Sequence, residues 1–151
     1  MIITFYVIHE LLSEQIVSPA ADRIARHPAV LDAIESILGP DLMVWTCELL
    51  AKEPHSPKML TMHQDLNYWG FDAVGQHVTA WIALSEVTDE NGPLEVVPGS
   101  HRGPIHSLWH DGAFTGAMDS DVAATMQRDA VSCVGLAGSV CLMHTKLAHA
   151  S

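Results

Sequence analysis

The sequence predicts a mainly β fold, an antiparallel jelly roll preceded by a helical flank over residues 1–40. Three observations lead to this fold class. Apolar residues recur at helical spacing before Pro40, short runs of strand-forming residues follow it, and turn-forming pairs such as Asn-Gly separate those runs. No internal repeat and no low-complexity linker divides the chain, so we expect residues 1–151 to form a single domain.

The helical flank begins with an apolar run at residues 1–8, which predicts a buried strand or the start of a helix. This run is too short to span a bilayer and lacks the basic residues and cleavage site of a secretion signal. Residues 9–27 are predicted to be helical, with Pro19 at a break or in a first helical turn. Pro28–Leu38 is a clearer helix, because a Gly-Pro pair follows it. Its apolar stripe comprises Val30, Leu31, Ile34, Ile37 and Leu38.

The rest of the chain has the pattern of strands and turns. The clearest alternation is in His77–Leu84, where every second residue is apolar and shares one face of the strand. An Asn-Gly pair predicts a tight turn at 89–92, residues 101–114 are predicted to be a polar loop, and an Asp-Ser pair caps a short helix at 119–128. The predicted strands are Leu42–Leu50, Met62–Gly70, His77–Leu84, Leu94–Val97, Ala130–Val134 and Ser139–His144, with turns at 72–76 and 135–138.

Charge and cysteine content disfavour several classes of protein. With 18 acidic and 7 basic residues the net charge is −11, which disfavours a nucleic-acid partner and an anionic membrane. The three cysteines are odd in number and have no CxxC spacing, so they fit a reducing cytoplasm better than a disulfide framework. Cys47 and Cys141 lie in apolar runs and are predicted to be small buried hydrophobes. A Ser-His-Asp hydrolase is not supported, because there is no GxSxG motif.

The stretch MHQDLNYWG, residues 62–70, contains two candidate metal ligands. On a strand, His63 and Asp65 are two apart and would face the same side. An imidazole and a carboxylate make up two thirds of the facial triad of non-haem Fe(II) oxygenases, whose third ligand is a histidine from elsewhere in the chain. His149 is the candidate, and His144 is its rival. The alternative is that His63 forms a local hydrogen bond and that Asp65 opens a turn.

Four motifs in this order, HQDLNYWG, VTAWIAL, ENGPLEVVPGSHR and GSVCLMHTKLAHAS, resemble the phytanoyl-CoA dioxygenase family from about Pro28 to the last residue. The resemblance implies a double-stranded β-helix, a cupin-like jelly roll. It also implies a dioxygenase that uses Fe(II), 2-oxoglutarate and O2 to hydroxylate a small organic molecule, with release of succinate and CO2.

Matching positions imply the roles of individual residues. The metal ligands fall on His63, Asp65 and His149, because the pattern H-x4-H-x-S selects the second histidine over His144. The resemblance also implies a cosubstrate pocket for 2-oxoglutarate. Its residues would be Gln64, Trp81, Ser151 and, with a weaker match, Cys47.

One departure from the family concerns the end of the chain. Relatives carry an arginine about ten residues beyond the distal histidine, whose guanidinium would pair with the 2-oxoglutarate carboxylate. The sequence ends at Ser151, two residues after His149, so we expect it to be a fragment, a truncated product or the ordered part of a longer enzyme that lacks the last strand. Two alternatives follow: a non-catalytic metal- or ligand-binding pseudoenzyme, and an interaction module whose open sheet edge pairs with a second chain.

Overall fold

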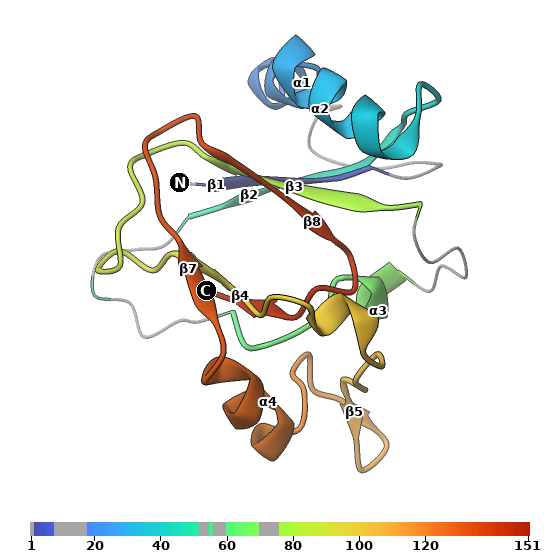
Figure 1. The fold of residues 1–151 in the computed structure, drawn as a ribbon, viewed down its shortest axis with the longest axis vertical. Coiled ribbons are helices and arrows are strands. Elements are labelled where there is room, and N and C mark those ends of the chain that lie inside the picture. Colours follow the sequence, from blue (N-terminus) through green and yellow to red (C-terminus); the bar gives the residue numbers. More distant parts are fainter. Residues whose placement is uncertain (1, 8–17, 52–54, 56–59, 70–75) are drawn as a thin grey trace. The chain divides into compact units, whose positions relative to one another are not determined.

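A computed structural model describes residues 2–7, 18–51, 55, 60–69 and 76–151 (Figure 1). The predicted turn at 72–76 and the first half of the predicted helix at 9–27 lie largely outside these residues. The chain divides into two compact units. Unit 1 comprises 1–51, 73–86 and 136–144, and unit 2 comprises 52–72, 87–135 and 145–151. The single domain expected from the sequence stays a prediction.

Unit 1 contains a four-stranded antiparallel sheet with the strand order β2-β1-β3-β8 (Figure 1). The bounds are β1 Ile2–Val7, β2 Val44–Leu50, β3 Val78–Ala83 and β8 Val140–His144. The predictions of the last three strands are confirmed with their ends moved by one or two residues. The apolar start of the chain is a strand, so the helical flank expected at 1–40 also holds an inner strand of the sheet.

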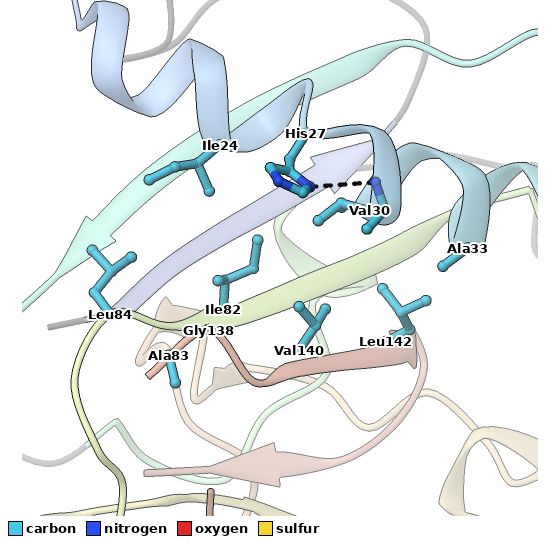
Figure 2. A pocket seen from close by; sticks show the side chains of 11 residues that line it. Ile24, His27, Val30, Ala33, Ile82, Ala83, Leu84, Gly138, Val140 and Leu142 are labelled. Atoms are coloured by element: carbon cyan, nitrogen blue, oxygen red, sulfur yellow. Dashed lines mark hydrogen bonds between the residues drawn. The ribbon is translucent and has the colours of Figure 1, made fainter. Parts of the chain in front are cut away.

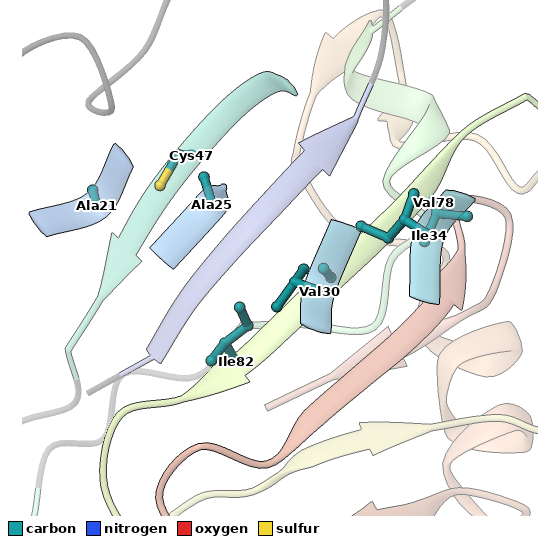
Figure 3. Close-up of a cluster of buried hydrophobic side chains, with 8 residues drawn as sticks. Ala21, Ala25, Val30, Ile34, Cys47, Val78 and Ile82 are labelled. Carbon is teal, nitrogen blue, oxygen red and sulfur yellow. The ribbon is translucent and has the colours of Figure 1, made fainter. Parts of the chain in front are cut away.

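Two helices cover one face of this sheet, α1 at Pro19–Ala25 and α2 at Pro28–Leu38 (Figure 1). Each has a proline in its first turn, where the missing N–H costs no intrahelical hydrogen bond. The helix α2 ends at Gly39, as the Gly-Pro pair predicts. Gly39 has φ +90°, a backbone conformation that residues with a Cβ rarely adopt. The core between helices and sheet comprises Ala21, Ala25, Val30, Ile34, Cys47, Val78, Ala80 and Ile82 (Figure 3).

The alternation predicted for β3 is confirmed. Val78, Ala80 and Ile82 face the helices, whereas Thr79 and Trp81 lie on the opposite face of the strand. All six residues of β3 are buried, and β3 has a neighbouring strand on each side.

An apolar cavity of about 490 Å³ lies between the helices and strands β3 and β8 (Figure 2). Aliphatic side chains make up most of its lining, among them Ile24, Val30 and Leu142. His27 also lines it, and its Nδ1 accepts the Ala29 N–H at 3.3 Å as the cap of α2. This cavity belongs entirely to unit 1.

Unit 2 contains a three-stranded antiparallel sheet with the order β7-β4-β9 and a separate two-stranded hairpin, β5-β6. The bounds are β4 Leu94–Val96, β5 Trp109–His110, β6 Ala113–Phe114, β7 Val131–Cys133 and β9 His149–Ala150, with α3 Leu66–Trp69, α4 Ser120–Gln127 and a 3-10 turn η2 at Ser100–Arg102. Its apolar core comprises Met62, Val97, Leu108, Met118, Ala148 and Ala150. The predicted α4 is confirmed, and Asp119 caps it by accepting two backbone N–H groups.

Two predictions for unit 2 are wrong. The strand expected at Met62–Gly70 is a single bridging residue, His63, followed by a turn and by α3. The Leu66 N–H donates to the Thr145 carbonyl at 3.0 Å, and this long-range bond together with the local turn bonds outweighs strand propensity. The loop expected at 101–114 contains the β5-β6 hairpin, whose Asp111-Gly112 turn has φ of 52° and 80°. This Asp-Gly pair is the signal that would have predicted it.

Candidate metal centre

Two segments of unit 2, distant in sequence, bring the candidate ligands together. His63 and His149 face each other in an antiparallel bridge and exchange both backbone hydrogen bonds, at 2.9 and 3.0 Å. Leu60 and Ser151 exchange a second pair, at 2.8 and 3.0 Å. Strand β9 is also paired with β4, where Val96 is opposite His149. Backbone pairing on both sides therefore fixes the position of His149.

Asp65 lies between the two imidazoles. Its Oδ1 is 3.5 Å from Nε2 of His63 and 3.3 Å from Nε2 of His149. The three side chains are buried, and their ligand atoms all lie within 4.8 Å of one another. Donor atoms bound to one transition metal at about 2.0–2.2 Å lie roughly 3 Å apart. Two imidazole nitrogens and one carboxylate oxygen at these separations fit a facial metal site.

Each histidine is oriented by the backbone carbonyl two residues before it. Nδ1 of His63 lies 2.6 Å from the Thr61 carbonyl, and Nδ1 of His149 lies 2.9 Å from the Leu147 carbonyl. Because a carbonyl oxygen only accepts, we assign the Nδ1 proton to both rings. Nε2 of each ring is then the atom presented to Asp65 or to a metal.

The charges of Asp65 and His149 depend on each other. Burial would raise the pKa of Asp65, but hydrogen bonds and charge interactions with His149 and His63 outweigh burial and hold that pKa well below its usual value. Burial would lower the pKa of His149, but the hydrogen bond to Asp65 outweighs it and raises that pKa. Without metal, the Asp65 carboxylate therefore favours the form of His149 that holds a proton.

Metal affinity should therefore increase with pH, because the metal must displace this proton. Because the pKa of His149 is raised in the folded chain, protonation of this ring stabilises the metal-free fold. The stabilisation is fully present below the ordinary histidine pKa of about 6.5 and is lost as the pH rises through the folded-state pKa. Competition titrations with Zn²⁺ or Co²⁺ from about pH 6 to about pH 9 measure the effect. An affinity that does not change over this range would contradict the assignment.

Gln64 lies between the two ligands in sequence and has 0% exposed surface. Its Nε2 donates to the carbonyls of Lys146 at 2.8 Å and Pro104 at 3.2 Å, and its Oε1 accepts the His106 N–H at 2.9 Å. Gln64 therefore ties the ligand segment to two other segments of unit 2. Its assignment to the 2-oxoglutarate pocket stays a prediction.

The other residues assigned to the cosubstrate pocket lie in both units. Ser151 belongs to unit 2, and its backbone pairs with Leu60. Cys47 and Trp81 belong to unit 1. Cys47 has 1% exposed surface and lies in the apolar core beside α1, as expected of a small buried hydrophobe (Figure 3). The cosubstrate roles of these three residues stay predictions.

His144, the rival third ligand, is the last residue of β8 and pairs with Val78 in unit 1. It is not part of the His63, Asp65 and His149 group, which is the one such group among the described residues. We expect His149→Ala to abolish Zn²⁺ binding and His144→Ala to leave the affinity within about twofold, since His144 is not one of the three grouped residues. Equilibrium dialysis measures both, and a larger loss in His144→Ala would reverse the choice of ligand.

Comparisons with known proteins identify the family to which the chain belongs. A family model described as phytanoyl-CoA dioxygenase (PhyH) matches residues 4–151. The chain is 33% identical over 127 residues to the peroxisomal phytanoyl-CoA dioxygenase of Bos taurus, a match that covers 72% of this chain and 38% of the bovine protein. It is 38% identical over 86 residues to L-proline trans-4-hydroxylase of Streptomyces griseoviridis, covering 55% of this chain and 32% of that enzyme.

Among solved structures, the apo form of the non-heme monooxygenase ThoJ superimposes with a TM-score of 0.70 at 35% identity, covering 88% of this chain and 48% of that one. The predicted jelly-roll fold class is thereby confirmed. The chain spans 38% of the length of the bovine relative.

Proposed function

Because this chain belongs to the phytanoyl-CoA dioxygenase family, we propose that it is an Fe(II)- and 2-oxoglutarate-dependent dioxygenase that hydroxylates a small organic molecule. The convergence of His63, Asp65 and His149 on one buried point is the observation that carries the proposal. Iron, 2-oxoglutarate and O2 would supply the oxidation, with succinate and CO2 as coproducts.

The side chains of the chain have defined parts in this proposal. Two imidazole Nε2 atoms and the Asp65 carboxylate would hold the metal on one face and leave three coordination positions for cosubstrate and O2. The low pKa of Asp65 keeps the carboxylate charged, and the carbonyls of Thr61 and Leu147 hold both rings in the ligating tautomer. A carboxylate ligand also disfavours halogenation, which needs that position for halide.

The charge of the chain fits a small-molecule partner better than a nucleic acid. The net charge of −11 opposes binding to a phosphate backbone. Among the described residues, no helix combines the length and the hydrophobicity needed to cross a bilayer.

The proposal is tested on the 151-residue chain with anaerobic Fe(II) and 2-oxoglutarate. We expect a visible charge-transfer absorption when both are present, and succinate formation once O2 is admitted. Iron binding without affinity for 2-oxoglutarate in calorimetry would favour the non-catalytic metal-binding alternative. An oligomer in light scattering with no bound metal in elemental analysis would favour the interaction module.

A further inference from the structure

A row of aromatic rings begins at one candidate ligand and continues onto the β5-β6 hairpin. The Tyr68 ring meets the His63 ring edge-on, with centroids 5.6 Å apart. Phe114 meets Tyr68 edge-on at 6.0 Å, and Trp109 lies 5.5 Å from Phe114. We call Tyr68, Phe114 and Trp109 the aromatic patch. All three belong to unit 2, as does the metal centre.

The three side chains of the aromatic patch are exposed, although large aromatic side chains usually lie mostly buried. Tyr68 is 44%, Phe114 49% and Trp109 62% exposed, and the three make up a third of the nine Phe, Trp and Tyr residues of the chain. Trp109 and Phe114 are a cross-strand pair, which by itself stabilises a hairpin. Hairpin stability does not require the contact of Phe114 with Tyr68, or that of Tyr68 with a metal ligand. Contiguous exposed apolar surface is a common feature of binding sites, and here it is in contact with a candidate metal ligand.

The hairpin is held in place, so the patch is presented in one arrangement. Leu108, with 1% exposed surface, anchors the hairpin in the core, and its carbonyl accepts from both the backbone N–H and the hydroxyl of Thr115. Ser107 accepts the Trp109 N–H at 3.0 Å, and a His110 ring nitrogen lies 2.9 Å from the Ala117 carbonyl. A surface arranged before binding loses little conformational entropy when a ligand arrives.

The chemistry of the patch is apolar. The Tyr68 hydroxyl donates to the Gly116 carbonyl at 3.1 Å and is therefore already paired within unit 2. The hairpin segment 107–117 contains no Lys or Arg, and its charged residue, Asp111, is acidic. An anionic group would therefore find no cation in this segment, whereas an aliphatic or aromatic body would gain contact with three rings.

We propose that the aromatic patch binds the apolar, non-anionic body of the substrate and positions it beside the metal centre. The inference rests on the proposed function, because it specifies the kind of substrate that the same site would bind. The substrate is the expected occupant because the patch is continuous with His63, a residue that the proposed reaction uses.

The test uses two probes with the same apolar body, neutral 4-phenyl-1-butanol and anionic 4-phenylbutane-1-sulfonate, whose head group is a weak metal ligand. Chain loaded with paramagnetic Co²⁺ is compared with chain loaded with Zn²⁺, and the relaxation of the probe protons reports both affinity and proximity to the metal. We expect the neutral probe to bind more tightly than the sulfonate and to relax faster with Co²⁺.

Trp109→Ala and Phe114→Ala should each weaken binding of the neutral probe by about tenfold, as expected for removal of an aromatic contact surface. Phe114→Leu should lie between Phe114→Ala and the parent, and it remains informative if the alanine variant fails to fold. The matched control is Val131→Ala, which truncates a 53% exposed apolar side chain on β7 of the same unit and should bind like the parent.

Several outcomes would overturn the inference: no binding of the neutral probe, equal or tighter binding of the sulfonate, or unchanged binding in Trp109→Ala and Phe114→Ala. A dimer in light scattering that Trp109→Ala converts to a monomer would assign the patch to a second copy of the chain instead. Failure of the proposed function is recognised separately, because it appears as absent metal or absent 2-oxoglutarate binding in the parent chain.

Discussion

Asp65→Ala is expected to weaken metal binding by more than about 100-fold and to abolish succinate formation, while the metal-free chain stays folded. Loss of outer groups that only orient ligands costs 10–100-fold, so loss of an anionic ligand should cost at least as much. The fold should tolerate the change, because removing Asp65 also removes the interaction that raises the pKa of His149, and burial then favours the uncharged ring. Zn²⁺ competition titrations and thermal unfolding measure the two effects.

Two other variants, His149→Ala and Asp129→Ala, provide comparisons for the stability and the metal affinity of Asp65→Ala. His149→Ala leaves the buried Asp65 carboxylate with one fewer imidazole partner, so it should destabilise the metal-free chain more than Asp65→Ala does. Asp129→Ala removes an exposed carboxylate that follows α4 and is the matched control, with no change expected in either measurement. Tight metal binding by Asp65→Ala would rule out the proposed centre.

Gln64→Ala is expected to destabilise the chain by about 3 kcal/mol, because it leaves two carbonyls and one N–H without their partner inside unit 2. For a chain of this size such a loss lowers the melting temperature by roughly 6–12 °C. Gln64→Glu keeps the acceptor for the His106 N–H but opposes a carboxylate to two carbonyl oxygens, so we do not expect it to restore stability.

The chain offers a matched control for Gln64. The side-chain amide of Gln127 donates to Glu95 at 2.7 Å on the surface, where water replaces a lost partner. Gln127→Ala should change the free energy of unfolding by less than about 0.5 kcal/mol. Gln64→Ala could instead change the free energy of unfolding as little as Gln127→Ala does while lowering the affinity for 2-oxoglutarate. The contacts of Gln64 would then contribute little to stability, and its assignment to the cosubstrate pocket would gain support.

Local patterns were sufficient for several elements. The spacing of Val30 and Ile34 and the Gly-Pro pair predicted α2 with its bounds, and alternation predicted which face of β3 meets the helices. Motif position also named the three residues that the structure brings together at one buried point. The helix and the strand faces depend on neighbours in sequence, whereas the three ligands were named by the resemblance to a known family.

Contacts between distant segments decided the rest. The bond from the Leu66 N–H to Thr145 helps to place a turn and a helix where propensity favours a strand, and the His63–His149 bridge, rather than strand alternation, sets the ligand geometry. The sequence by itself determined the fold class and α2, and its resemblance to a known family named the candidate ligands. Only the tertiary structure decided the anchoring carbonyls, the contacts of Gln64 and the aromatic patch, because each joins groups whose separation along the chain carries no local signal.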